Sequence, residues 1–343
     1  MKDSKTIDVC LVGHDVQPSM AFTALVSELS SRGLRVLLAV MNGKEYPTLQ
    51  SEVISLSRFV LIGMSSLDNA VSEIEAATMA NKLGVPFGFY AGETFLCYRR
   101  SWFSSFWETA SLVFAFNQSE VNEAQRYFPN AKIVPTGNPT HASYFTFDSK
   151  IDVERKLGLS PKHFVVFVGG GGSLQINQEL LAATVYACGD IPEVRIIFGL
   201  HPGDKNPVEK YREYTKDFAV PVTMTTRSIV SGSSVLSRAN LLITSATSLG
   251  IEAACKRVPV INFLTTLGCD SLEQVTGGRV WPPCKHGVSM KVEDPISLRK
   301  VIQEKSYEKL RQRQEEVYPA PTEPGKSASL SLMADAVCSF VNK

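Results

Sequence analysis

The feature that most constrains this chain is an alternation of short apolar runs with longer amphipathic segments. Residues 34–40 are almost continuously apolar, as expected of a strand that is buried on both faces of a parallel sheet. The apolar run 8–12 is followed by hydrophobic residues at three- and four-residue spacings over 20–29, which predicts a helix. Repeated strand–helix units of this kind predict a doubly wound parallel sheet. The remaining strands expected in the first half are 59–62, 86–90, 112–116 and 132–134.

The alternation stops over 136–150, where glycine, proline and polar residues replace the apolar runs, and then it restarts. A length of 343 residues also favours two domains. We therefore expect two Rossmann-like α/β domains that face a cleft, followed by a last helix that packs back on the first domain. The expected divisions are residues 1–145, 146–325 and 326–343. The strands expected in the second half are 164–168, 194–199, 220–223, 241–244 and 259–263.

Charge and cysteine content narrow the function classes. Lys and Arg total 35 against 34 Asp and Glu, a formal net charge of +1, which argues against a strongly basic nucleic-acid binder. Seven cysteines without a Cys-x-x-Cys pair favour reduced thiols over disulfides or a zinc site. No run approaches 18 apolar residues, so no transmembrane helix is expected. We expect a soluble, cytoplasmic protein with no metal site.

Ligands of open parallel sheets bind at the carboxyl ends of the strands, so the loops after strands are the places to look for a site. A glycine run, 169–173, follows the strand 164–168 and opens a helix over 175–188. Without Cβ atoms, such a backbone can approach a diphosphate closely, and the N–H groups at the helix start point toward it. A tight structural turn is the alternative. The candidate binding residues of this segment are Gly170, Gly171, Gly172, Ser173 and Asn177.

A second strand–helix junction, 244–254, is rich in hydroxyl groups. The hydroxyls can cap the helix or contact a phosphate, and a carboxylate one turn inside the helix can accept both hydroxyls of a ribose. The alternative is an ordinary helix cap with a favourable acid in the first turn. The candidates here are Ser245, Thr247, Ser248, Leu249, Gly250 and Glu252.

Two of the five histidines follow strands. His14 stands after Gly13 in the first loop, and His201 follows the strand 194–199. An imidazole titrates near neutral pH, which suits proton abstraction from a hydroxyl, although a lone histidine is more often structural. A third segment, 99–107, combines two arginines with four large aromatic residues. It is either a peripheral membrane or acceptor surface, or a helix of the core.

Taken in order, these segments resemble GT-B nucleotide-sugar enzymes. Residues 12–14, 136–139, 169–177 and 245–260 resemble the transferase that adds N-acetylglucosamine to the lipid-linked peptidoglycan precursor. The resemblance implies a phosphate loop at the glycine run, ribose contact at Glu252 and a base site near Arg227 and Ile229. It also implies His14 as the general base of a metal-independent, inverting transfer from a UDP-sugar to an acceptor hydroxyl, with no other cofactor.

Other segments resemble UDP-N-acetylglucosamine 2-epimerases. Residues 200–202 resemble their histidine loop, and 325–328 resemble the start of their last helix. This implies an alternative epimerase or hydrolase that uses His201 and Glu93 as acid–base groups. The acidic residues that those epimerases use in the first domain have no clear counterpart except, vaguely, Glu93. A non-catalytic binding subunit is a further alternative. The sequence names neither the sugar, the acceptor (a glycan, a lipid-linked or small molecule, less readily a nucleic acid) nor the oligomeric state.

Overall fold

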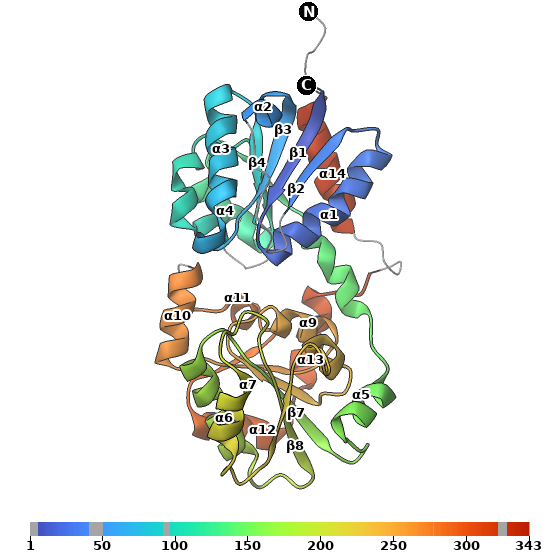
Figure 1. The fold of residues 1–343 in the computed structure, drawn as a ribbon, viewed down its shortest axis with the longest axis vertical. Helices are drawn as coiled ribbons and strands as arrows, with labels where there is room; N and C mark the ends of the chain where they lie inside the picture. Colours follow the sequence, from blue (N-terminus) through green and yellow to red (C-terminus); the bar gives the residue numbers. More distant parts are fainter. Residues whose placement is uncertain (1–5, 41–50, 92–96, 277, 322–327, 343) are drawn as a thin grey trace, which may run out of the picture. The chain divides into compact units, whose positions relative to one another are not determined.

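The computed structural model describes residues 6–40, 51–91, 97–276, 278–321 and 328–342. It divides into two compact units. Unit 1 contains residues 1–142, 275–277 and 323–343, and unit 2 contains residues 143–274 and 278–322. Each unit has one six-stranded parallel sheet with flanking helices (Figure 1). The fold class expected from the alternating pattern is therefore confirmed.

The sheet of unit 1 has the strand order β2-β1-β3-β4-β5-β6, and every pairing is parallel. The chain first moves outward from β1 to β2 and then crosses back to β3, so the order reverses between β1 and β3. At such a reversal point, the loops that follow the two strands diverge and leave room for a ligand. The strands are β1 (Ile7–Gly13), β2 (Val36–Val40), β3 (Ser57–Gly63), β4 (Phe87–Tyr90), β5 (Leu112–Ala115) and β6 (Lys132–Pro135).

Helices cover both faces of this sheet. The helices α1 (Val16–Ser31) and α14 (Ala328–Val341) share one buried cluster with Val9 and Leu11 of β1. The last helix thus packs on the first unit, as expected. The helix α3 (Val71–Leu83) packs against β1, β3 and β4. The other helical elements are α2 (Ser51–Ser55), α4 (Val121–Tyr127), η1 (Leu67–Asn69), η2 (Cys97–Arg99), η3 (Ser101–Phe106), η4 (Gln118–Glu120) and η5 (Pro139–Phe145).

The sheet of unit 2 has the order β12-β11-β10-β7-β8-β9, again with parallel pairings only. Here the order reverses between β7 and β10, because β8 and β9 lie on one side of β7 and β10 to β12 lie on the other. This is the strand order of a dinucleotide-binding sheet. The strands are β7 (Phe164–Gly169), β8 (Val194–Gly199), β9 (Val222–Thr225), β10 (Leu241–Thr244), β11 (Val260–Phe263) and β12 (Met290–Val292).

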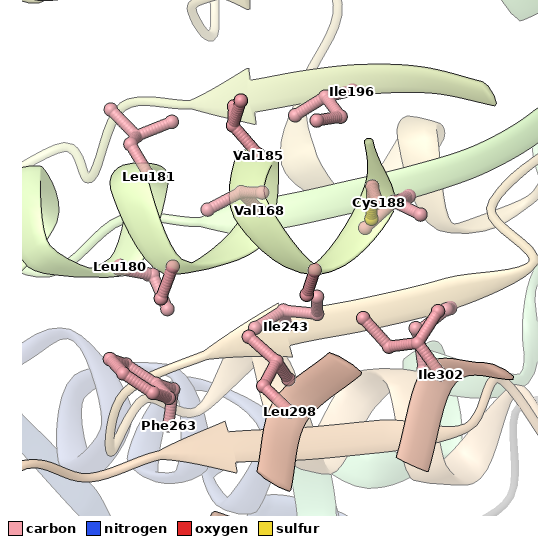
Figure 2. Packing of buried hydrophobic residues seen from close by; sticks show 14 of the residues in the cluster. Val168, Leu180, Leu181, Val185, Cys188, Ile196, Ile243, Phe263, Leu298 and Ile302 are labelled. Atoms are coloured by element: carbon pink, nitrogen blue, oxygen red, sulfur yellow. The ribbon is translucent and has the colours of Figure 1, made fainter. Parts of the chain in front are cut away.

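Two buried clusters hold helices on the two faces of the second sheet. On one face, α6 (Leu174–Cys188) and α12 (Pro295–Glu304) pack through side chains such as Leu180 and Leu298 against Ile243 (Figure 2). On the other face, α5, α8 and α9 share a cluster with alternate residues of the same strands. The remaining helices and those just named are α5 (Lys150–Leu157), α7 (Val208–Thr215), α8 (Gly232–Leu236), α9 (Leu249–Cys255), α10 (Thr266–Thr276), α11 (Pro282–Lys285) and α13 (Glu308–Val317).

Local sequence signals explain where several helices begin and end. Asp294 Oδ1 accepts hydrogen bonds from the N–H groups of Ile296 and Ser297, at 3.0 and 2.9 Å, and a proline starts α12. Gly84 ends α3 in the left-handed conformation, with φ of 67°. All the expected strands are present, and β12, whose three residues include a lysine, was not predicted. The run 34–40 was expected to be buried on both faces, but β2 lies at the edge of its sheet, where Leu37 and Leu38 are 37% and 36% exposed.

The aromatic segment 99–107 lies in the core of unit 1. Phe103 and Phe106, on η3, are 0% and 5% exposed. Their rings lie 5.3 and 6.1 Å from the ring of Phe89. These two aromatic side chains therefore belong to the core and cannot form the alternative membrane or acceptor surface. The segment forms 3-10 helices instead of the expected α-helix. Within the described ranges, no helix combines the length and hydropathy needed to cross a membrane.

Candidate functional site

In unit 2, the glycine run and the hydroxyl-rich loop meet at the reversal of strand order. The glycine run follows β7, and residues 245–248 follow β10, the strand beside it. Gly169 pairs with Thr244 in the sheet, and Thr244 Oγ1 donates a 2.7 Å hydrogen bond to the Gly169 carbonyl. The structure thus brings the two candidate segments together at the carboxyl ends of two central strands.

The first two glycines of the run are required by packing. A Cβ on Gly169 would lie 2.8 Å from Leu249 Cδ2, and a Cβ on Gly170 would lie 2.9 Å from Phe198 Cζ. Leu249, one of the candidate binding residues, therefore closes the space beside the glycine run. The structural interpretation of the run applies to these positions.

The other end of the run is open. A Cβ on Gly172 would meet no atom within 4 Å, and Gly172 is exposed. Ser173 immediately precedes α6, a helix of 15 residues. Within the described part of the chain, the N–H groups of Gly172 and Ser173 have no hydrogen-bond partner. Unpaired N–H groups at the positive end of a long helix are suited to an anion.

Asn177 shapes this loop from beneath. Its side chain is 0% exposed. Its Oδ1 accepts a 2.7 Å hydrogen bond from the Gly171 N–H, and its Nδ2 donates to the Gly171 carbonyl at 2.9 Å. The same Nδ2 lies 3.1 Å from Asp204 Oδ2 and 3.0 Å from the Tyr211 hydroxyl. With its polar atoms used in this way, Asn177 contributes to a site through the shape of the glycine loop.

His201 lies on the neighbouring loop, after β8. Asp204 of this loop accepts hydrogen bonds from Asn177 and, at 2.5 Å, from the Tyr211 hydroxyl, which ties the His201 loop to the glycine run. His201 is exposed, and its Nδ1 accepts a 3.0 Å hydrogen bond from the Gly203 N–H. Partial desolvation of the ring by its neighbours lowers the pKa of His201. The negative charge of Asp204 raises that pKa by a smaller amount, so the neutral imidazole is favoured.

The hydroxyl-rich loop differs in exposure along its length. Ser245 is 8% exposed, Thr247 is half-buried and Ser248 is exposed. Thr247 Oγ1 lies 3.1 Å from Thr244 Oγ1. Gly250 is buried, and a Cβ there would lie 3.5 Å from a methyl group of β11. The accessible hydroxyl groups are therefore those of Thr247 and Ser248.

Glu252, in the first turn of α9, is held by one of its two oxygens. Oε1 accepts a hydrogen bond from the Ser233 hydroxyl and lies 3.7 Å from Lys256 Nζ. Lys256 is buried, donates to the Thr146 carbonyl and stands over the Phe147 ring at 4.8 Å. Within the described residues, Oε2 has no hydrogen-bond partner. That oxygen remains available to a ligand.

A cavity of about 390 Å³ lies in unit 2 beside the loop after β9. The two residues expected near a base, Arg227 and Ile229, line it, and both are exposed. Ser234, the neighbour of the serine that holds Glu252, also lines it. The other lining residues are Asp148, Ser149, Asp152, Val153, Lys156, Ser228, Val230 and Ser231.

In unit 1, His14 stands at the other reversal point, in the loop after β1. The loop is tied to α3 by a hydrogen bond of 3.0 Å from the His14 N–H to Glu73 Oε1. Ser65, after β3, donates to the same carboxylate through its N–H and its hydroxyl, both at 2.7 Å. Glu73 is 0% exposed, and burial raises its pKa to about 7.

A second carboxylate joins the same two loops. Asp15 accepts hydrogen bonds from the Ser66 N–H and from Asn69 Nδ2, both at 2.7 Å. Its own N–H donates to Ser65 Oγ at 2.8 Å. Packing explains the glycine at position 13, one of the candidate binding residues, because a Cβ there would lie 3.1 Å from Phe22 Cδ2.

Glu73 and Lys256 were not among the functional residues predicted from the sequence. Glu73 is a polar residue on the buried face of α3 with Ala76, Ala77 and Ala80, so its helical spacing was the available signal. Lys256 stands four residues after Glu252, on the same side of a helix. Glu93, a catalytic candidate, lies outside the described residues, as do residues 325–327 of the epimerase-like segment.

Known structures resemble the chain over almost its whole length, although no family model and no curated protein matches its sequence. S. aureus MnaA in a co-structure with UDP has a TM-score of 0.70 and 13% identity, over 98% of this chain and 97% of that one. The UDP-GlcNAc 2-epimerase of Neisseria meningitidis bound to UDP-GlcNAc has a TM-score of 0.65 and 11% identity, over 97% and 100%.

MurG of Acinetobacter baumannii has a TM-score of 0.57 and 13% identity, over 97% of this chain and 99% of that one. CalG4, the calicheamicin glycosyltransferase, is also among the similar structures, so epimerases and glycosyltransferases appear together. At these identities the likeness concerns architecture. The chain has the two-domain GT-B fold that these nucleotide-sugar enzymes share.

Proposed function

We propose that this protein binds a UDP-linked sugar in unit 2 and transfers the sugar to an acceptor hydroxyl without a metal ion. One observation carries the proposal: at the reversal point of unit 2, the N–H groups of Gly172 and Ser173 have no partner among the described residues. A diphosphate needs such donors. Two of the similar structures, S. aureus MnaA with UDP and the Neisseria meningitidis epimerase with UDP-GlcNAc, contain such a ligand, which supports this choice.

The proposed donor pose uses the neighbouring groups of unit 2. The diphosphate lies against Gly172 and Ser173, with the hydroxyl groups of Thr247 and Ser248 beside it. Glu252 Oε2 accepts hydrogen bonds from the ribose hydroxyls, since its Oε1 is already held. The base enters the cavity lined by Arg227 and Ile229.

In the proposed reaction, the His14 imidazole takes the proton of the acceptor hydroxyl. The acceptor oxygen forms a bond to the anomeric carbon as the bond from that carbon to the diphosphate oxygen breaks. The negative charge that develops on the leaving diphosphate is stabilised by the N–H groups at the start of α6, which are already oriented before the reaction. This arrangement predicts inversion at the anomeric carbon.

The two carboxylates described at the unit 1 reversal point favour transfer over epimerisation. Glu73 is buried and Asp15 is bonded to the loop after β3, so both are occupied with the protein's own donors. A 2-epimerase or hydrolase remains the second candidate, because His201 lies on the loop tied to the glycine run. The seven free cysteines are consistent with a cytoplasmic protein.

The test is a screen of nucleotide-diphosphate sugars by thermal shift and turnover, with EDTA present and with acceptors added in a second series. Stabilisation by one UDP-sugar, with turnover only when an acceptor is present, supports the transferase. Conversion of the donor without an acceptor supports the epimerase or hydrolase instead. Stabilisation without turnover under any condition supports a binding subunit.

A histidine substitution then tests the proposed base. We expect His14→Ala to lower turnover by about 10²–10⁴-fold, the usual effect of losing a general base. His286→Ala, in the loop after α11, is the matched control and should leave turnover unchanged. Turnover of His14→Ala within about threefold of the unmodified protein would contradict the assignment.

A further inference from the structure

We propose that Glu73 is a positioning residue whose ionised carboxylate fixes the backbone of the His14 loop by joining it to the loop after β3. The importance of this contact for catalysis rests on the proposed function of His14. The positioning effect does not depend on that function, because it concerns only the contact between the two loops and can be measured without a substrate.

The carboxylate accepts three hydrogen bonds from the two loops. Oε1 receives the N–H of His14 at 3.0 Å and the hydroxyl of Ser65 at 2.7 Å, and Oε2 receives the N–H of Ser65 at 2.7 Å. Backbone N–H groups cannot reverse their direction as a hydroxyl can. A glutamine at position 73 would therefore set its amide NH₂ against one of the two backbone donors in either orientation.

The surrounding strand makes room for this group. Gly63 is the last residue of β3, and a Cβ there would overlap Glu73 Oε1 and lie 2.8 Å from Pro18 Cβ. The space over Gly63 is therefore filled by a carboxylate from α3 and by the first turn of α1. The packing around Gly63 therefore defines the position of the Glu73 carboxylate independently of its hydrogen bonds.

The groups that face the carboxylate are mostly neutral or anionic. Asp15, on the loop after β1, adds a like charge. Arg100, the residue immediately before η3, donates to the Met64 carbonyl beside the Ser65 loop. Among the described residues, no cation forms an ion pair with Glu73. Protonation would place a hydrogen on one oxygen and weaken the bond to a backbone N–H, so the proton on Glu73 and the His14 loop are coupled.

The test is an NMR titration of the backbone amide signals of His14 and Ser65, compared between the unmodified protein and Glu73→Gln. In the unmodified protein, we expect both signals to shift together with one inflection that belongs to Glu73. In Glu73→Gln, that shared inflection should disappear and both signals should be displaced. Glu75→Gln, an exposed residue of the same helix, should behave as the unmodified protein does.

A separate readout distinguishes this proposal from the proposed function. UDP binding to Glu73→Gln, measured by calorimetry, should remain within about twofold, because the proposed donor groups belong to unit 2. If Glu73→Gln fails to fold, the titration of the unmodified protein alone decides. Independent titration of the His14 and Ser65 amides, or an unchanged shared inflection in Glu73→Gln, would overturn the proposal even if UDP binds as expected.

Discussion

The two reversal points have the same place in their sheets but opposite chemistry. In unit 1, the carboxylates of Glu73 and Asp15 accept hydrogen bonds from the loops after β1 and β3. In unit 2, the loop after β7 offers the N–H groups of Gly172 and Ser173, which have no partner among the described residues. The loop donors of unit 1 are thus bonded to the protein's own carboxylates, whereas these two donors of unit 2 are unpaired within the described residues.

The same reversal of strand order thus occurs with two different patterns of hydrogen bonding in the loops. In both sheets, helices begin soon after the strands at which the order reverses, and loops at such a point commonly leave room for a ligand. We therefore expect the buried glutamate of unit 1 and the open glycine of unit 2 to determine that the proposed diphosphate binds in unit 2.

The largest effect is expected from the charge of Glu73 on folding. Burial raises its pKa from 4.5 to about 7, so its contribution to stability is fully present below pH 4.5 and is lost as the pH rises through about 7. Relative to Glu73→Gln, the unmodified protein should lose about 3 kcal/mol of unfolding free energy between pH 4.5 and pH 8. Urea unfolding at several pH values measures this difference, because ionisations common to both proteins cancel.

Tryptophan fluorescence suits this measurement. Two of the three tryptophans, Trp102 and Trp107, belong to unit 1, so the signal reports mainly on the unit that contains Glu73. A pH dependence that is the same in both proteins would show that Glu73 ionises at its ordinary pKa, and the contrast between the two reversal points would lose its basis in unit 1.

The second prediction places an anion on the open loop of unit 2. Gly172→Asp should lower the affinity for UDP by about 100-fold, because a carboxylate would repel the diphosphate at close range. Gly172→Ala is the matched control and should bind UDP within about twofold, since a Cβ there meets no atom within 4 Å. Calorimetry with EDTA present measures both. Equal loss in the two variants would mean that shape, and not charge, governs the loop.

The third prediction concerns the ribose. Glu252 is expected to make the protein prefer UDP over its 2′-deoxy analogue by about tenfold, the size of one hydrogen bond to a charged group. Glu252→Gln should reduce that preference, and Lys256→Met should reduce it in part, because Lys256 helps to hold Oε1. An unchanged preference in Glu252→Gln would remove Glu252 from the proposed ribose site.

The smallest effect is expected beneath the glycine loop. Tyr211→Phe removes one hydroxyl from the network of Asn177 and Asp204 and should cost about 1 kcal/mol of stability. UDP affinity should fall by no more than about threefold, because Asn177 keeps its two bonds to Gly171. Urea unfolding and calorimetry check the two values. A large loss of UDP affinity without a loss of stability would instead mean that the Tyr211 hydroxyl contacts the ligand.

Much of the fold followed from the sequence because the central strands, such as β1, β3, β7 and β10, are short apolar runs that are almost entirely buried. The loops after β7 and β10 were recognisable for the same reason, since each directly follows such a run. The strand order of the second sheet, with its reversal at β7, could not be predicted, because strand order depends on contacts between distant segments. The segment 99–107 was ambiguous because its aromatic spacing suits both a surface and a core.

The side-chain environment was the part that sequence reasoning could not supply. Asn177 was expected to contact the ligand, yet the structure shows its amide fully enclosed by the protein's own groups. Glu73 was overlooked because a glutamate in a helix is usually exposed, and only the three alanines on its face hinted at burial. Whether a polar residue meets a ligand or the protein depends on packing that no local pattern encodes.

The most direct test of the central claim is to map which backbone amides UDP protects from hydrogen exchange, with EDTA present. We predict protection over 171–174 and 245–252 in unit 2 and no change over 13–16 and 64–66 in unit 1. Protection confined to the unit 1 loops, or no protection anywhere at saturating UDP, would contradict it.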